Sequence, residues 1–111
     1  MGNGDAGTGR YRKPLPKPIK FAIGRVLITP GAATEIAEEE ITKALRRHQH
    51  GDWGALDARE KACNEQVLRI GGWLLSAYDD PASGERFLII TQPDRMITTV
   101  MVPDEFGKLR D

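Results

Sequence analysis

The chain has 111 residues and carries 16 lysines and arginines against 16 aspartates and glutamates. This length predicts one folded domain, and the formal net charge of zero excludes a protein that grips nucleic acid through bulk positive charge. The single cysteine, Cys63, cannot form an internal disulfide, so we expect a cytoplasmic protein. No apolar run approaches the roughly 20 residues that span a bilayer, so we expect no membrane contact.

The first 20 residues differ in composition from the rest of the chain. They combine four glycines with three prolines that alternate with other residues, which predicts a disordered, extended arm. The arm has five basic groups against one acidic group, a net charge of +4, so residues 21–111 carry a net charge of −4. We therefore predict a disordered basic Gly/Pro-rich arm over residues 1–20 and a single α+β domain over residues 21–111.

The first predicted elements of the domain are a strand and a helix. Residues 21–28 alternate in hydrophobicity, which is typical of a strand. Thr29 and Pro30 then predict the N-cap and first residue of a helix. The apolar stripe of this helix runs to His48, and Gly51 is its predicted stop.

A second helix is predicted from Asp57, which with Glu60 forms a capping box. A pair of glycines ends this helix. We expect Cys63 to be a small buried hydrophobe, and we expect the neighbouring Asn64 to bond to the loop around Trp53 or to a strand backbone. The predicted apolar face consists of Ala62, Cys63, Val67 and Ile70.

Three strand-like runs follow, over residues 73–78, 86–91 and 97–102. The short links between them predict an antiparallel meander, and each helix has one apolar stripe to bury against it. The predicted fold is therefore α+β with the order β-α-α-β-β-β. It has an antiparallel sheet of three to four strands and two helices packed on one face.

Several motifs resemble a family of small, mostly uncharacterised bacterial proteins associated with plasmids, prophages and other mobile elements. The motifs are the Gly-Asp-Trp-Gly loop of residues 51–54 and the closing segment of residues 90–106. That segment follows the family pattern I-T-x-x-D-R-x-x-T-T-V-L-L-P-x-E-Y, with conservative departures at Met101, Val102 and Phe106. The resemblance covers residues 21–106 and implies a mobile-element setting without implying a reaction.

The sharpest polar cluster is the turn of Asp94 and Arg95 with the nearby Thr98 and Thr99. Arg95 can hold a phosphate or carboxylate through two hydrogen bonds, and Asp94 can orient it. Successive strand residues point to opposite faces, so only one threonine can join them; we take Thr98 as the candidate. The alternative is an Asp-capped turn with a surface arginine.

The Gly-Asp-Trp-Gly loop and the histidines before it offer further candidates. Trp53 can serve as a stacking platform for a base or a partner side chain, or it can plug the sheet edge. Asp52 is either a contact residue or a turn-former. His48 and His50 with Asp52 have ligand types suited to zinc, but we favour a solvated helix end and predict neither a metal site nor a cofactor.

Three functions are compatible with these features. The preferred one is a non-enzymatic binding module, an accessory factor of a bacterial mobile element that contacts a protein or nucleic acid as a monomer or homodimer. The contacts would come from the Trp53 loop, the sheet end bearing Arg95 and the arm. The arm contributes Arg10, Arg12 and Lys13.

Two alternatives stay open. A small metal-independent ribonuclease, similar to RelE-like and barnase-like toxins, would use His48 or His50 as general acid and base and Arg95 to stabilise the phosphorane. The acidic body is unlike such toxins, which are strongly basic. An inhibitor of a host defence system would use its acidic surface to mimic nucleic acid, but interleaved lysines and arginines weaken that mimicry.

Overall fold

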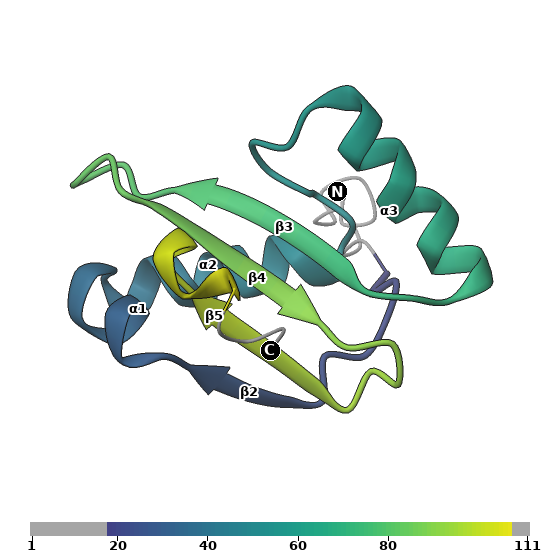
Figure 1. The fold of residues 1–111 in the computed structure, drawn as a ribbon, viewed down its shortest axis with the longest axis horizontal. Coiled ribbons are helices and arrows are strands. Elements are labelled where there is room, and N and C mark those ends of the chain that lie inside the picture. Colours follow the sequence, from purple (N-terminus) through teal and green to yellow (C-terminus); the bar gives the residue numbers. More distant parts are fainter. Residues whose placement is uncertain (1–17, 108–111) are drawn as a thin grey trace, which may run out of the picture.

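The computed structural model describes residues 18–107, which form an α+β fold (Figure 1). Most of the predicted arm, including Arg10, Arg12 and Lys13, lies outside the described residues. Within this part of the chain, no helix is long and apolar enough to cross a membrane. The elements are β2 (Arg25–Ile28), α1 (Pro30–Glu35), α2 (Glu38–Gln49), α3 (Ala58–Ile70), β3 (Leu74–Asp79), β4 (Arg86–Thr91), β5 (Ile97–Met101) and a short 3-10 helix, η2 (Pro103–Glu105).

Within residues 18–107, the sheet has four strands in the order β2-β5-β4-β3. The predicted antiparallel meander of β3, β4 and β5 is confirmed. The prediction of a wholly antiparallel sheet is wrong, because β2 pairs with β5 in parallel. These two strands are separated by three helices and two strands, so no tight turn forces them to run in opposite directions.

The predicted first helix is two helices, α1 and α2. Thr29 caps α1, since its side chain accepts a hydrogen bond from the amide of Ala32. The backbone is extended at Ile36 and Ala37, which ends α1 and starts α2. The break lets α1 stay close to β5 while α2 takes a separate direction across the sheet (Figure 1).

The carboxylate of Glu105 ties the end of the described chain to the start of α1. It accepts hydrogen bonds from the Thr29 hydroxyl at 2.6 Å, from the Gly31 amide at 3.2 Å and from the Val102 amide at 3.0 Å. This position belongs to the closing motif of the sequence, so its local role is structural: an acidic side chain occupies the N-terminus of a helix.

The main core lies between the sheet and the helices α1 and α2. It contains buried aliphatic side chains of both helices together with aromatic and aliphatic side chains of the strands: Ala32, Ile36, Ile41, Ala44, Tyr78, Phe87, Ile89 and Val100. A smaller cluster of Phe21, Trp53 and Leu74 packs against Val67 and Leu68 of α3. Both clusters lie on the same side of the strands, because Leu74 and Tyr78 are an even number of residues apart.

The second predicted helix, which is α3 in the structure, packs in an orientation that the sequence pattern does not predict. Its capping box of Asp57 and Glu60 is confirmed, but Ala62 and Cys63 are exposed, and Ile70 is 72% exposed. The buried residue is Asn64, whose amide exchanges two hydrogen bonds with the backbone of Leu75 in β3. The expectation of a buried Cys63 is therefore wrong, and that of a backbone-bonded Asn64 is confirmed.

Candidate functional site

His48 lies in the interior of the protein, on the side of α2 that faces the sheet. Its side chain is 0% exposed, so the interpretation of a solvated helix end is wrong for this residue. Its Nδ1 is 2.5 Å from the Ser76 hydroxyl, and its Nε2 is 2.9 Å from the Thr91 hydroxyl. The chain of contacts continues from Thr91 to Thr98 at 2.7 Å and from Thr98 to the carbonyl of Ile23 at 2.8 Å.

The direction of these hydrogen bonds follows from the carbonyl of Ile23, which is the last acceptor in the series. A carbonyl can only accept, so Thr98 donates to Ile23 and must accept from Thr91. Thr91 then accepts from Nε2–H of His48, and a neutral ring accepts at Nδ1 from Ser76. The geometry therefore assigns a neutral His48 that carries its proton on Nε2. In this arrangement the hydroxyl groups of Ser76, Thr91 and Thr98 are all hydrogen-bonded.

Burial holds His48 in this neutral form. Burial, with a smaller contribution from the positive charge of Arg95, lowers the pKa of His48 from the usual 6.5 to about 3. The ring is covered by Phe21 and Trp53, whose centroids lie 5.0 and 5.8 Å from its own. This arrangement binds protons weakly and offers no surface to a substrate.

Trp53 is buried as well, at 3% exposure. Its ring stacks on Phe21 at a centroid distance of 6.0 Å, and its indole N–H donates to Glu65 at 2.7 Å. The loop also pairs with the outer edge of β3, because the amide of Ala55 donates to the carbonyl of Ala77 at 2.7 Å. These contacts favour the interpretation of Trp53 as an edge plug over that of a stacking platform.

Arg95 and Asp94 form the predicted Asp-capped turn. The Asp94 carboxylate accepts from the amide of Met96 at 2.9 Å. Arg95 has a positive φ of 61°, and one of its terminal nitrogens donates to the carbonyls of Gly72 at 2.6 Å and Gln92 at 2.9 Å. The guanidinium thus joins the β4–β5 turn to the start of β3, and the fully buried Thr98 does not reach the surface beside it.

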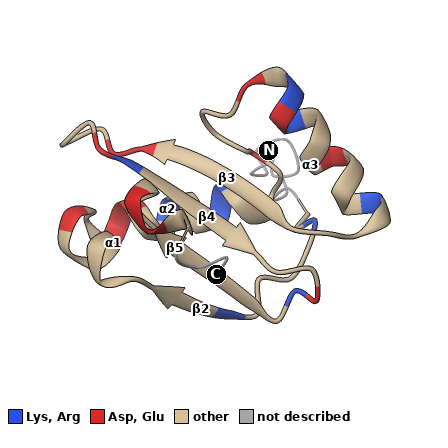
Figure 2. Cartoon of the chain, viewed as in Figure 1, with Lys and Arg blue, Asp and Glu red and all other residues tan. Residues whose placement is uncertain are grey.

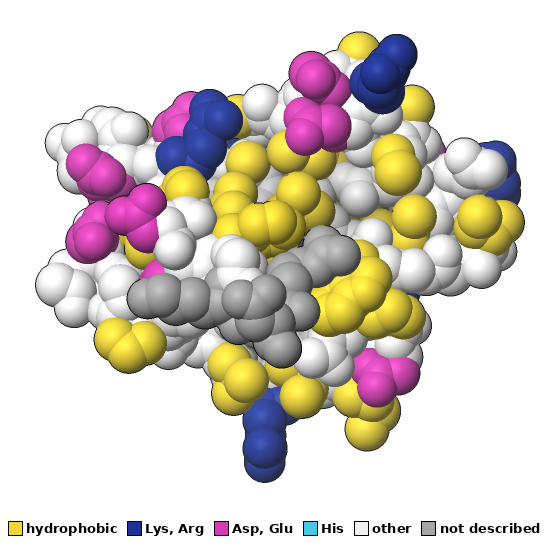
Figure 3. Space-filling model, viewed as in Figure 1, with side chains coloured by type: hydrophobic (Ala, Val, Ile, Leu, Met, Phe, Trp, Pro, Cys, Tyr) yellow, Lys and Arg dark blue, Asp and Glu magenta, His cyan; other side chains and the backbone are white. Residues whose placement is uncertain are grey.

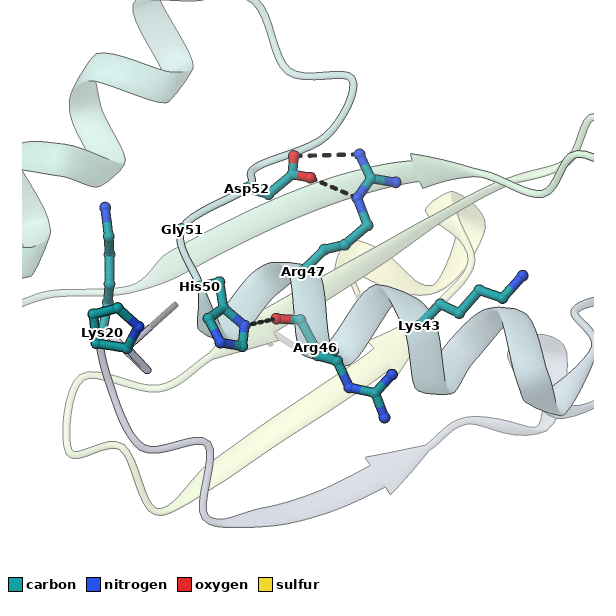
Figure 4. A pocket seen from close by; sticks show the side chains of 8 residues that line it. Lys20, Lys43, Arg46, Arg47, His50, Gly51 and Asp52 are labelled. Atoms are coloured by element: carbon teal, nitrogen blue, oxygen red, sulfur yellow. Dashed lines mark hydrogen bonds and ion pairs between the residues drawn. The ribbon is translucent and has the colours of Figure 1, made fainter. Parts of the chain in front are cut away.

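A basic pocket of about 860 Å³ lies at the end of α2, and we call it the α2 pocket (Figure 4). The cations of α2 project from the side of the helix opposite to the buried Ile41, Ala44 and His48. Lys20 reaches the same place because its amide donates to the carbonyl of Gln49 at 2.9 Å. The pocket is lined by Pro18, Lys20, Lys43, Arg46, Arg47, His50, Gly51 and Asp52.

Two of the cations in the α2 pocket form ion pairs with other residues of the range 18–107, and two do not. Arg47 makes a bidentate ion pair with Asp52, with nitrogen–oxygen distances of 2.7 and 3.2 Å, and lies 4.7 Å from the ring centroid of Tyr78. Its hydrogen bond lowers the pKa of the Asp52 carboxyl below the usual range. Lys43 pairs with Glu40 at 3.3 Å. Among the described residues, Lys20 and Arg46 have no ion pair.

The structure therefore separates most of the residues predicted to act together. Asp52 and His50, the C-cap residue of α2, are the two candidates that line the solvent-exposed α2 pocket. None of the four cations that line the pocket is among the sequence-predicted site residues: Lys20, Lys43, Arg46 and Arg47. The sequence signal for this site is the spacing of Lys43, Arg46, Arg47 and His50 on one helical face, but basic residues near a helix C-terminus are also favoured by the helix dipole alone.

Comparisons with protein-family models, with curated proteins and with solved structures found no match for this chain. Among the described residues, no group of three or more histidines, cysteines, aspartates and glutamates is placed to hold a metal ion. The candidate site therefore has to be interpreted from its own geometry and charge.

Proposed function

We propose that the protein is a non-enzymatic binding module that contacts the phosphate backbone of a nucleic acid through the α2 pocket. The observation that carries the proposal is that four cationic side chains, together with His50, line one solvent-exposed hollow along the outer side of α2. Lysine and arginine side chains supply most of the affinity of proteins for nucleic acids by neutralising phosphates.

The helix dipole alone does not account for this charge. Basic residues in the last turn of α2 and Glu38, Glu39 and Glu40 in its first turn have the order that the dipole favours. Lys20, however, comes from a different segment of the chain and still opens on the same pocket. Figure 2 shows acidic residues around α1, at the end of the molecule away from this pocket.

The segment that precedes the pocket in the sequence adds to the proposal. Pro18 lines the α2 pocket, and the predicted phosphate contacts Arg10, Arg12 and Lys13 lie five to eight positions before it in the sequence. Because the basic arm adjoins the pocket at its C-terminal end, arm and pocket can contact the same polyanion. The mobile-element setting forms part of the proposal and rests on the sequence resemblance alone.

The test is the binding of labelled oligonucleotides to the full chain, measured by fluorescence anisotropy over a range of salt concentrations. The variant Lys20→Glu/Arg46→Glu reverses the charge of the two pocket cations that have no ion pair within the described part of the chain. We expect it to weaken binding about ten-fold or more and to reduce the salt slope by about 2. The matched control, Arg59→Glu/Arg69→Glu, makes the same charge change at two exposed positions of α3.

The outcomes separate the proposal from its competitors. Equal weakening by both double variants means that only net charge matters, and it would overturn the pocket as the site. A wild-type chain that binds neither single-stranded nor duplex probes at low salt overturns the nucleic-acid partner. Cleavage of an RNA probe, by an activity that stays with the protein throughout its purification, would instead support the ribonuclease alternative.

A further inference from the structure

The two edges of the sheet differ in whether another described part of the chain pairs with them. The outer edge of β3 is closed by the chain itself, through the pairing of residues 53–55 with Ala77 and through the side chain of Asn64. Among the described residues, no element pairs with the outer edge of β2, which lies at the bottom of the view in Figure 1. An unprotected edge strand is a template for pairing with another strand.

The backbone of β2 shows which of its groups face outward. The amides of Arg25 and Thr29 donate to the carbonyls of Met96 and Val100 at 2.9 and 3.0 Å, so these residues face β5. Backbone groups alternate in direction along a strand, so Leu27 shares this phase while Val26 and Ile28 turn their N–H and C=O groups away from the sheet. Among residues 18–107, neither Val26 nor Ile28 has another backbone partner.

The side chains along the same edge are apolar and partly uncovered. Leu27 and Ile28 are each 44% exposed. Val26 packs against the core on the side of α2, so Ile28 lies on that side as well and Leu27 on the opposite side. Hydrophobic side chains gather over that opposite side of the strands in Figure 3, with the charged residues at its margin.

We propose that β2 pairs antiparallel with β2 of a second copy of this chain. In the register centred on Leu27, that residue faces Leu27 of the second copy across the two-fold axis. Val26 and Ile28 then exchange backbone hydrogen bonds with Ile28 and Val26 of the other copy. The result is a continuous sheet of two four-stranded halves.

The self-complementarity of the strand favours a second copy over an unrelated peptide. Each outward N–H meets an outward C=O, each apolar side chain meets another, and Arg25 lies opposite Thr29 rather than opposite a second arginine. Like charges directly across a pair would be destabilising, and this register avoids them. Isologous contacts of this kind produce the commonest closed oligomer, the two-fold dimer.

The pairing has a consequence for the α2 pocket. Residues directly opposite one another in a sheet point to the same face, so the helices of both copies lie on one side of the joined sheet. Both pockets then open on the same side of the dimer. If the proposed function holds, a long polyanion can contact both pockets at once, and the avidity exceeds that of one pocket. The dimer itself does not depend on that function.

The first test measures the mass of the full chain by analytical ultracentrifugation over a concentration series. We expect concentration-dependent dimers for the wild type. Leu27→Lys places two lysines face to face and should weaken the dimer about ten-fold or more. The control Ile70→Lys changes an apolar residue that is 72% exposed elsewhere and should leave the dimer intact. Circular dichroism confirms that both variants remain folded.

The second test measures the register by disulfide formation in a Cys63→Ser background. Residues facing each other in a non-hydrogen-bonded antiparallel pair have Cα atoms about 4.5 Å apart, within the range of a disulfide. Leu27→Cys should therefore give a covalent dimer on mild oxidation, whereas Met96→Cys, 64% exposed on a turn, should cross-link only slowly.

Three results would overturn the proposal: a wild type that stays monomeric at the highest concentration, a dimer unaffected by Leu27→Lys, or no preferential cross-link through Leu27→Cys. Binding of an unrelated extended peptide by a monomeric chain would assign the edge to another partner. A dimer that forms normally but binds no nucleic acid would refute the proposed function and leave this inference standing.

Discussion

The two faces of α2 differ in both burial and charge. On the inner face, His48 is completely buried, neutral and part of a directional chain of hydroxyl groups. On the outer face, His50 lies among lysines and arginines around the α2 pocket. The two histidines are only two positions apart, which on a helix places them on opposite sides. The same side-chain type therefore has a structural role on one face and a candidate binding role on the other.

The largest expected effect comes from removing the inner histidine. His48→Ala leaves a cavity and deprives the hydroxyls of Ser76 and Thr91 of their buried partner, so we expect a loss of about 3 kcal/mol in the free energy of unfolding. His50→Ala should change it by less than about 0.5 kcal/mol. Urea denaturation followed by tryptophan fluorescence measures both. Similar losses for the two variants would contradict the difference between the faces.

The next effect is a dependence of stability on pH that belongs to the inner face. The pKa of His48 is about 3 in the folded protein and 6.5 as an ordinary value, so the unfolded chain binds the extra proton between these values. Stability is therefore unaffected above about pH 6.5 and falls as pH drops below it, by about 2 kcal/mol at pH 5.

The control for the pH effect is His48→Gln, which cannot titrate in this range. Urea denaturation near pH 7.5 and near pH 5 should show a smaller loss for this variant than for the wild type, by about 2 kcal/mol. The variant can be less stable at both pH values without affecting the test, because only the difference between the two is compared. An equal loss in both proteins would show that other groups cause the acid sensitivity.

A smaller effect is expected at Asp52, because its carboxylate pairs with Arg47 and so competes with a phosphate for that guanidinium. Asp52→Asn removes the ion pair of a half-exposed aspartate and arginine, which should cost about 0.5 kcal/mol of stability. The same change frees Arg47 and removes a negative charge from the α2 pocket, so nucleic-acid affinity should rise a few-fold. Oligonucleotide titrations of this variant at fixed salt measure that gain; a loss of affinity would mean that Asp52 itself contacts the ligand.

The smallest effect on stability is expected from the unpaired cations. Arg46→Ala and Lys20→Ala remove exposed side chains that form no ion pair with any residue the structure describes, so each should change the free energy of unfolding by less than about 0.5 kcal/mol. Thermal or urea unfolding of both variants provides the measurement. A substantial destabilisation would indicate that the outer face holds the fold together, and its proposed binding role would then lose its main support.

Local pattern was enough to predict much of the fold. The alternation of apolar residues and the turn compositions predict β3, β4 and β5 and their antiparallel pairing, since two short turns leave few other arrangements. Capping residues predict where α1 and α3 begin, because a cap satisfies amides within a few residues of itself. The parallel pairing of β2 with β5 depends on contacts between distant segments, and the pattern of β2 alone does not indicate a direction.

The candidate site was predicted less well than the fold. Arg95 and Trp53 have residue types suited to binding. However, one terminal nitrogen of Arg95 donates to the backbone carbonyls of Gly72 and Gln92. The ring of Trp53 stacks on Phe21. Whether such a side chain faces solvent or neighbouring backbone is set by elements far away in the sequence. The α2 pocket escaped prediction because Lys20 joins it only once the chain before β2 has folded back against the end of α2.

The sequence by itself determined the local properties of this protein: where its strands alternate, where its helices begin, and the separation of its zero net charge into a basic arm and an acidic body. These properties depend on neighbours within a few residues. Only the tertiary structure decided that His48 is buried, that Cys63 is exposed, that β2 lies at an edge of the described sheet and that four cations line one pocket. Burial, edge and pocket are relations between segments distant in the chain, and packing settles them.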